Sequence, residues 1–424
     1  MSIKLIFTQN KDKVILLGGD YKKRMKKVCV LGSGYAGLFS AANLLTDNDL
    51  KNKLEINIFD KNPYHQLLQQ IHLVTAGIKK TSEISFPIHD LMKDDVKFYN
   101  EVVLGVNFNE NKIITSNNKE YNFDYVIIAL GASNAFFGIK GAKEYAQSFR
   151  SLNDALVLQN KIRDMNKDIN IIICGGGATG VSLAGALCET FKEKIKITIV
   201  EAQSDILPEW NSKLVRSIKN FLKQNNVEII TNNPIKEVHQ SSVLLNDNTI
   251  LENTLSIWTA GIKGQEIHTI PTIEKTKSNR IKVNNFSQVE GFSNAFALGD
   301  ISAFPIDTLH SSPQLAQFAV RQAMNVAKNI IRREKGKEMV RFHFEQHGSI
   351  LSLGRECMGI MNGVIIKGSL CGYVEDFLID NYISTIKNRG RGISSLAYEQ
   401  HKLSQISSSL SFIISTASKI LSSD

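Results

Sequence analysis

Two glycine-rich segments, each between a predicted strand and a predicted helix, constrain the fold of this 424-residue chain more than any other feature. In the first, the apolar run 27–31 precedes the loop and LFSAANLL follows it; in the second, NIIIC (170–174) precedes and VSLAGALCETF follows. The two loops read Gly32-Ser33-Gly34-Tyr35-Ala36-Gly37 and Gly175-Gly176-Gly177-Ala178-Thr179-Gly180. Strand, G-x-G-x-x-G and helix in this order are typical of a dinucleotide-binding βαβ unit. The sequence therefore predicts two such units in an α/β chain.

The glycines and the acids that follow them have distinct roles in this pattern. The first glycine permits a tight turn, the second lets backbone amides approach a pyrophosphate, and the third lets helix and strand pack closely. The strand after each helix ends in an acid: Asp60 lies 60 − 32 = 28 positions after the first glycine, and Glu201 lies 201 − 175 = 26 positions after. Both spacings exceed the usual value of about 20, but a carboxylate there can still bind ribose hydroxyls. Glu201, with no arginine beside it, favours NAD over NADP.

Two dinucleotides on one chain must be held so that their redox atoms can meet. The economical pairing is FAD on the first loop and NADH on the second, with the nicotinamide stacked on the flavin for hydride transfer. The sequence therefore predicts an FAD-dependent oxidoreductase that takes hydride from NADH.

Composition adds few limits. Hydrophobic residues make up 43% and charged residues 21%, which is typical of a globular chain of two or three domains. The net charge of +9 favours anionic partners, although much of it is lysine scattered among Asn and Ser, as on an ordinary solvated surface. We predict no transmembrane span and no signal peptide. The first domain begins near Lys26, so Met25 could be the natural start.

The five cysteines, at positions 29, 174, 188, 357 and 371, form no CxxC pair, and their odd number argues against a disulfide framework. A reducing cytosol fits this pattern. His343 and His347 lie four apart in RFHFEQHGSILSLG, which alternates like strands, and that spacing on a strand is too long for one metal ion. We expect no metal site.

Five further segments, two between the glycine loops and three after them, occur in a recognisable order. They are NPYHQLLQQIHLVTAG (62–77), DYVIIALGAS (124–133), SIWTAGIKG (256–264), NAFALGD (294–300) and SPQLAQFAVRQAMNVAKNI (312–330). With them, residues 26 to about 400 resemble the two-dinucleotide-domain flavoproteins and, within these, the type II NADH dehydrogenases, which are non-proton-pumping NADH:quinone oxidoreductases. In that resemblance 62–77 lies beside the flavin, 124–133 crosses back from the NAD domain to the FAD domain, 294–300 is a second FAD fingerprint, and 312–330 is an Ala-Gln-x-x-x-x-Gln helix.

The resemblance implies a set of site residues. Those for FAD are Gly32, Ser33, Gly34, Tyr35, Ala36, Gly37, Asp60, Lys61, Val103, Ala129, Gly131, Gly299, Asp300, Ala316 and Gln317, and those for NADH are Gly175, Gly177, Ala178, Thr179, Gly180, Glu201, Ala260 and Gly261. Asp300 would bond the ribityl or phosphate portion, and the backbone of Val103 would receive the adenine. Amides at the start of the 314–330 helix would stabilise the reduced flavin. Gln317 and Gln322 would line the quinone pocket as the catalytic residues.

The chain departs from this family at two places. The family usually has a glutamate two residues after the last glycine of the second loop, a candidate for guiding protons or quinone, whereas this chain has Ser182. The family often carries tryptophans on the membrane face of its C-terminal region, whereas the predicted helix VEDFLIDNYISTIKN (374–388) offers Phe377 and Tyr382. The proton donor to the quinone is therefore open.

Three alternative functions are compatible with the same fold. A disulfide reductase needs a redox-active cysteine pair beside the flavin, and there is no cysteine between Cys29 and Cys174. A sulfide:quinone oxidoreductase also needs sulfur-carrying cysteines, for which Cys174 and Cys357 are the only conceivable pair. A signalling or redox-sensing flavoprotein would suit the basic surface, but no patch rich in arginine and aromatic residues indicates nucleic-acid binding.

The fold class expected is α/β, with two Rossmann-like domains, for FAD and NAD, and a C-terminal membrane-associating α+β region. The boundaries expected are 1–25 for an N-terminal extension, 26–133 and 263–335 for the FAD-binding domain, 134–262 for the NADH-binding domain, and 336–424 for the C-terminal region.

Apolar residues at 403, 406, 410, 413, 417, 420 and 421 form one helical stripe. It packs either on protein or in the membrane interface, and Lys and Arg at 387, 389, 391, 402 and 419 favour the interface. We expect peripheral binding at the cytoplasmic face of the cell membrane and quinone as the partner. A homodimer is possible, and the sequence leaves the oligomeric state open.

Overall fold

The computed structural model describes residues 24–50, 52–164, 170–191, 195–252, 254–307, 310–346 and 348–389. Nearly all of the predicted N-terminal extension and the whole apolar stripe of residues 403–421 lie outside these described residues.

Two five-stranded parallel sheets form the centre of the molecule. The first has the strand order β22-β9-β1-β2-β5 and the second β11-β18-β12-β13-β14. In each sheet the central strand, β1 (Lys26–Leu31) or β12 (Asn170–Cys174), leads into a glycine loop. Both strands are apolar and largely buried, as expected where both faces of a parallel sheet are covered. Four strands of each sheet share one relative order, β9-β1-β2-β5 and β18-β12-β13-β14, which confirms the predicted α/β class with two Rossmann-like units.

The other strands of these sheets come from distant parts of the chain. In the first sheet they are β2 (Leu54–Phe59), β5 (Lys97–Tyr99), β9 (Tyr125–Ile128) and β22 (Ala295–Ala297); in the second they are β11 (Gln147–Ser148), β13 (Lys196–Val200), β14 (Val227–Ile230) and β18 (Thr254–Trp258). Since β22 pairs with β9, the chain completes the second sheet before it returns to the first.

Smaller sheets flank the two large ones; their pairs are antiparallel except β20 with β6 and β21 with β23, which are parallel. One group has the order β20 (His268–Ile270), β6 (Val103–Asn107), β7 (Lys112–Thr115) and β8 (Glu120–Asn122), and another has β15 (Ile235–Val238), β16 (Ser242–Leu245) and β17 (Ile250–Glu252). Two short pairs are β3 (Tyr64–Gln66) with β4 (Ser85–Pro87), and β21 (Ile281–Lys282) with β23 (Ser302–Ala303).

The helices that cover the sheets have these bounds: α1 (Tyr35–Leu44), α2 (Ile71–Thr75), α3 (Thr81–Ile84), α4 (Ile88–Met92), α5 (Ala142–Tyr145), α6 (Leu152–Asp164), α7 (Ala178–Phe191), α8 (Ser212–Gln224), α9 (Ala316–Glu334) and α10 (Gly368–Lys387). Short 3-10 turns are η1 (Leu68–Gln70), η2 (Lys93–Asp95) and η4 (Gly299–Ile301). The helix that follows each glycine loop, α1 after the first and α7 after the second, therefore begins within the loop itself.

A two-stranded ribbon connects the two sheets. β10 (Ala132–Asn134) pairs antiparallel with β19 (Ile262–Gly264), and the indole of Trp258 donates a hydrogen bond to Ala135 O at 2.9 Å. The expectation that residues 124–133 cross back to the FAD domain is wrong in direction. Because β9 belongs to the first sheet and β10 follows it, this segment leads out of that sheet, and β19 leads back.

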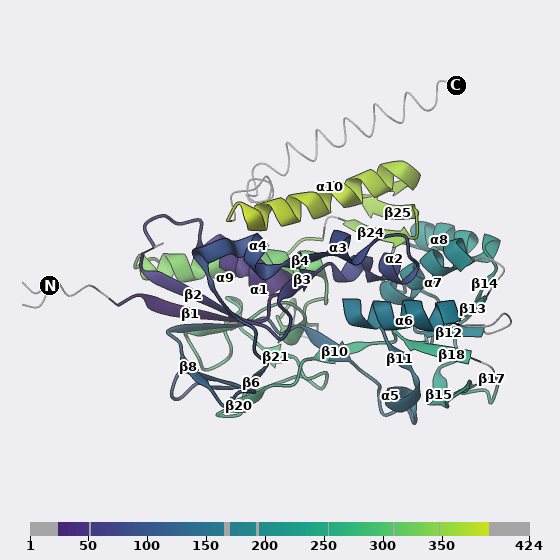
Figure 1. The fold of residues 1–424 in the computed structure, drawn as a ribbon, viewed down its shortest axis with the longest axis horizontal. Coiled ribbons are helices and arrows are strands. Elements are labelled where there is room, and N and C mark those ends of the chain that lie inside the picture. The colour runs from purple at the N-terminus through teal and green to yellow at the C-terminus, as the bar shows by residue number, and fades with distance from the viewer. Residues whose placement is uncertain are drawn as a thin grey trace, which may run out of the picture.

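The C-terminal described part is a three-stranded antiparallel sheet followed by a long helix. The strands are β24 (Gly348–Leu353), β25 (Glu356–Met361) and β26 (Val364–Lys367). Residues 341–346 form no strand, contrary to the prediction, and α10 begins six residues before the predicted start at 374. In Figure 1, α10 extends across one side of the molecule, over elements of both sheets.

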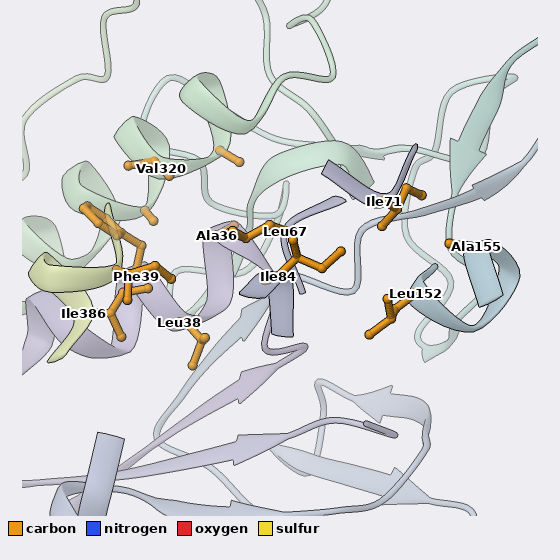
Figure 2. Packing of buried hydrophobic residues seen from close by; sticks show 14 of the residues in the cluster. Ala36, Leu38, Phe39, Leu67, Ile71, Ile84, Leu152, Ala155, Val320 and Ile386 are labelled. Atoms are coloured by element: carbon orange, nitrogen blue, oxygen red, sulfur yellow. The ribbon is translucent and has the colours of Figure 1, made fainter. Parts of the chain in front are cut away.

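One hydrophobic core continues between the two halves. Figure 2 shows Leu67, Ile71 and Ile84 between Ala36 of α1 and Leu152 of α6, and all belong to the same cluster of buried residues. Small residues along α1 allow close packing, so that this helix lies between α9 and α10. The segment that follows β2 therefore fixes the first glycine loop relative to the second sheet.

Candidate dinucleotide and quinone site

The first glycine loop has the geometry that the three glycine positions require. Gly32 adopts φ +101°, and a Cβ there would lie 2.4 Å from Ala129 O. A Cβ at Gly37 would lie 1.8 Å from Gly32 O, so only glycine lets the helix pack against the turn. By contrast, a Cβ at Gly34 would meet no atom within 4 Å. The middle glycine therefore faces open space, into which a pyrophosphate can approach.

The second loop repeats this arrangement. Gly175 adopts φ +119°, and its Cβ would lie 2.5 Å from Ala260 Cα, which places the predicted residue Ala260 against the turn. A Cβ at Gly180 would lie 2.1 Å from Gly175 O, whereas one at Gly177 would meet nothing within 4 Å. Ala178 and Thr179, the first residues of α7, are exposed beside that open position. Both loops thus leave one side free for a ligand.

Each predicted acid reaches back to its own loop. Asp60 Oδ2 accepts hydrogen bonds from Ser33 N at 2.6 Å and from Ser33 Oγ at 2.8 Å. Glu201 Oε2 accepts from Gly176 N at 2.7 Å, and its other oxygen accepts from Gln203 N at 2.8 Å. The open glycine, the free helix N-terminus and the acid at the strand end are together the features that a dinucleotide needs.

The second FAD fingerprint meets the first loop at the start of α9. Gly299 adopts φ +68°, and a Cβ there would lie 3.3 Å from the Cβ atoms of Ala36 and Ala319. Helix α9 begins at Ala316, which is exposed, and no side chain caps its first turn. Its first amides and the positive end of its dipole are therefore available to a negatively charged group.

Asp300 lies at the junction of the two halves. Burial raises the pKa of its carboxyl, and the charges of Arg150 and Arg280 lower it. Arg150 Nη2 is 3.6 Å from Asp300 Oδ2. Arg150 belongs to no sequence motif and was not predicted as a site residue; it follows β11, at the edge of the second sheet, and this position brings it close to Asp300.

The two predicted glutamines have different surroundings. Gln317 is half-buried, and its amide donates to Gly348 O at 3.2 Å. Gln322 is fully buried; its Oε1 accepts from Gly299 N at 2.8 Å, and its Nε2 donates to Ser287 Oγ at 3.0 Å. Gln322 therefore holds the turn of the second fingerprint and does not line a pocket, which corrects its predicted role. It is a positioning residue.

The other predicted residues lie at the edges of these cradles. Lys61 is exposed next to Asp60, and Val103 begins β6 with its side chain buried. Gly131, between β9 and β10, adopts φ +73°. A Cβ at Gly261 would lie 2.5 Å from the ring of Phe137. None of these positions conflicts with a role in cofactor binding.

The segment beside the first loop contains contacts that no motif indicated. His65 is fully buried, with Nδ1 3.0 Å from Ser33 O and Nε2 3.3 Å from Tyr382 OH on α10. Burial lowers the pKa of His65 to about 4, so this ring is neutral at physiological pH. Leu152 N donates to Gln66 Oε1 at 2.7 Å. These contacts connect the loop, the second half and α10.

The cysteines do not form the pair that sulfide chemistry would need. Cys174 is buried in β12, and burial raises the pKa of its thiol to about 12. Cys357 forms a disulfide with Cys371, not with Cys174. The odd cysteine count argued against a disulfide framework, but one pair does form: β25 and α10 pack together and bring Cys357 and Cys371 to a Cα–Cα distance of 5.4 Å.

Two absences hold for the part of the chain that the structure describes. No helix there is long and apolar enough to cross a bilayer. No three His, Cys, Asp or Glu side chains there gather as ligands for a metal ion.

Comparison with known proteins agrees with this geometry. The family model of the pyridine nucleotide-disulphide oxidoreductases matches residues 26–323. The type II NADH:quinone oxidoreductase of Staphylococcus haemolyticus is 31% identical over 377 residues, which cover 82% of this chain and 93% of the relative. That of Staphylococcus aureus strain NCTC 8325 is 30% identical over the same shares.

Solved structures share the fold at lower identity. NDH2 from Plasmodium falciparum in complex with NADH has a TM-score of 0.76 and 18% identity, covering 86% of this chain and 96% of its own. The sulfide:quinone oxidoreductase of Aquifex aeolicus has a TM-score of 0.73 and 19% identity, covering 86% and 92%. At these identities the likeness shows the fold alone, whereas the sequence relatives show the family. This chain belongs to the pyridine nucleotide-disulphide oxidoreductases and, within them, to the type II NADH:quinone oxidoreductase family.

Proposed function

We propose that the chain catalyses the oxidation of NADH by a membrane quinone through bound FAD, without pumping protons. The observation that carries the proposal is the pair of open glycine cradles, each with its acid, on one chain. When bound, FAD accepts hydride from the nicotinamide and passes two electrons to the acceptor. The named relatives support quinone as that acceptor.

The residues of the chain bind and orient the two cofactors. The amides at Gly34 and the start of α1 would face the FAD pyrophosphate, Asp60 the ribose, and the backbone of Val103 the adenine. The amides at the start of α9 would stabilise negative charge on the reduced flavin. The second loop and Glu201 would hold NADH in the same way. Quinone would enter from the opposite side, near Gln317.

Stopped-flow spectroscopy of the purified protein tests this function. We expect a flavin spectrum that NADH bleaches under anaerobic conditions and that a short-chain quinone restores. If sulfide, and not NADH, bleaches the flavin, the result would instead favour the sulfide:quinone reaction. A bleached flavin that no quinone reoxidises would indicate a non-respiratory, redox-sensing flavoprotein.

We further propose that the protein binds the cytoplasmic face of the cell membrane peripherally. Two observations support this: the apolar stripe of residues 403–421, with its flanking basic residues, and exposed apolar side chains on α10. The latter are Tyr373, Phe377 and Leu378, of which Tyr373 is 72% exposed. A long-tailed quinone can be reached only from the bilayer, so this location suits the substrate.

Deletion of residues 400–424 should release the enzyme into the soluble fraction. Oxidation of NADH with a soluble acceptor should continue, since both cradles lie before residue 390. Sedimentation with vesicles that contain anionic lipid measures the binding. As matched variants, Ile413→Asp within the stripe should weaken sedimentation, and Ser408→Asp outside it should not. A truncated enzyme that still pellets with vesicles contradicts the proposal.

A further inference from the structure

A half-buried carboxylate, Glu375, lies on the inner side of α10. Its side chain is hydrogen-bonded to Gln70 of η1, and Glu375 Oε2 is 3.9 Å from Cys357 Sγ of β25. Gln70 is buried, and its Oε1 accepts from Lys79 Nζ at 3.2 Å. Two other elements, η1 and β25, therefore contact this carboxylate, although the next residue, Asp376, is exposed.

The first glycine loop is close to this carboxylate. Tyr35, the fourth residue of the loop, bonds through its hydroxyl to Gln69, the neighbour of Gln70. Its ring centroid is 5.1 Å from that of Tyr382, two turns after Glu375 on α10. Burial raises the pKa of Tyr35, and the charge of Glu375 raises it further. Glu375 is therefore within electrostatic reach of the loop that would hold FAD.

The second loop contributes no acid to this region. Ser182 is buried near the start of α7, and Gly185, three residues later on the same helix face, packs against Leu353 of β24. Strands β24 and β25 are paired, and α10 packs on β25. Ser182 and Glu375 are thus on two elements that pack on one small sheet, and of these two positions only the one on α10 is an acid.

The surroundings of Glu375 bring the pKa of its carboxyl group close to neutral pH. Burial, followed by the negative charge of Asp376, raises its pKa to about 7. Lys79 and the hydrogen bond from Gln70 act in the opposite direction. Cys357 is in a disulfide and carries no charge, and Tyr35 stays protonated. An acid with a pKa near the working pH is well suited to general acid catalysis.

We propose that Glu375 delivers the proton that quinone reduction consumes, a role that rests on the proposed function. The overall reaction is NADH + quinone + H⁺ → NAD⁺ + quinol. The hydride equivalent supplies two electrons and one proton, so one further proton is needed. The O–H bond of Glu375 breaks, an O–H bond of the quinol forms, and the remaining carboxylate takes its next proton from water on the exposed side of α10.

Acceptor-specific kinetics test this role. Glu375→Gln should lower quinone turnover by about 10²-fold, while ferricyanide reduction, which takes electrons without protons, should remain within twofold of wild type. Glu375→Asp keeps a carboxyl group and should restore part of the quinone rate. Asp380→Asn removes an exposed acid from the same helix and serves as the control, with both rates unchanged.

The pH dependence gives a second readout. The wild-type quinone rate should fall as pH rises through about 7, because the donor loses its proton. Asp376→Asn removes a charge that raises the pKa of Glu375, so this fall should move to lower pH. Lys79→Gln removes a charge that lowers it, so the fall should move to higher pH. Glu375→Gln should show no such fall.

Infrared spectroscopy follows the carboxyl group without turnover. A protonated C=O band that titrates near pH 7 should be present in wild type and in Asp380→Asn, and missing in Glu375→Gln. Equal quinone rates and pH profiles for wild type and Glu375→Gln would overturn the proposal. Loss of both the quinone and the ferricyanide activity in Glu375→Gln would also overturn it, as would full ionisation of the Glu375 carboxyl group at pH 5.5. If NADH bleaches the flavin of the wild-type enzyme but the enzyme never reduces quinone, the proposed function is refuted, and this inference with it.

Discussion

Gly177→Val should abolish reduction of the flavin by NADH in a protein that still purifies with its flavin. The middle glycine of the second loop faces open space, since a Cβ there meets no protein atom within 4 Å. A Cβ therefore fits the folded chain, and the valine side chain extends from it into the space that the NADH pyrophosphate needs. Two or three charge-assisted hydrogen bonds to loop amides are lost, each about 1.5–3 kcal/mol. We expect kcat/KM for NADH to fall by about 10³-fold or more.

Gly34→Val is the matched control on the other loop. A Cβ at this glycine also meets nothing within 4 Å, so the substitution is equally compatible with folding. We expect this variant to purify without flavin. The melting temperature of Gly177→Val, measured without NADH, should stay close to that of wild type. Loss of flavin in Gly177→Val and its retention in Gly34→Val would reverse the assignment of the two cradles.

The cradles could be predicted from sequence because each is local. A strand, a glycine loop, a helix and a strand follow one another within about thirty residues, and the turn geometry is set by glycines such as Gly32 and Gly175. The acids were found for the same reason, since each ends the next strand. The pattern therefore specifies a short segment whose geometry is determined by its own residues.

The corrected features depend on packing between distant segments. Gln322 was expected in a pocket because of its motif, but α9 packs on α1 and directs this amide into the turn at Gly299. Cys357 and Cys371 meet because α10 folds back on β25. Glu375 became a candidate only when the docking of α10 was known. No sequence period encodes such contacts.

Residues 341–346 show how a pattern can be right about burial and wrong about backbone. Phe342 and Phe344 alternate with polar residues, as in a strand. Phe342 is buried, with its ring centroid 5.2 Å from that of Phe318. However, no strand ladder forms here; the Phe342 backbone N–H donates a hydrogen bond to Asn285 O at 2.9 Å. The alternation reflects insertion of aromatic rings into the core and not strand pairing.

Glu201 should determine the preference for NADH over NADPH. Its carboxylate lies at the end of β13 and bonds to Gly176 N, next to the position of the adenosine ribose in the proposed complex. NADPH has a phosphate on the 2′ oxygen of that ribose. Two like charges about 4 Å apart near a protein surface repel by about 4 kcal/mol at most, so discrimination of about 10²- to 10³-fold is expected. Glu201→Gln removes the charge, and its amide oxygen can still accept from Gly176 N.

We therefore expect Glu201→Gln to raise kcat/KM for NADPH by at least tenfold and to lower it for NADH. Adding Gln203→Arg should increase the NADPH value further, because Gln203 is exposed two residues later and a guanidinium there can pair with the phosphate. Steady-state kinetics with a soluble acceptor and both nucleotides measure the ratio. Glu209→Gln, an exposed acid in the same connection, is the control and should leave the ratio unchanged. If the Glu201 variants keep the wild-type ratio, the ribose does not lie at the end of β13, and NADH must be held by other contacts.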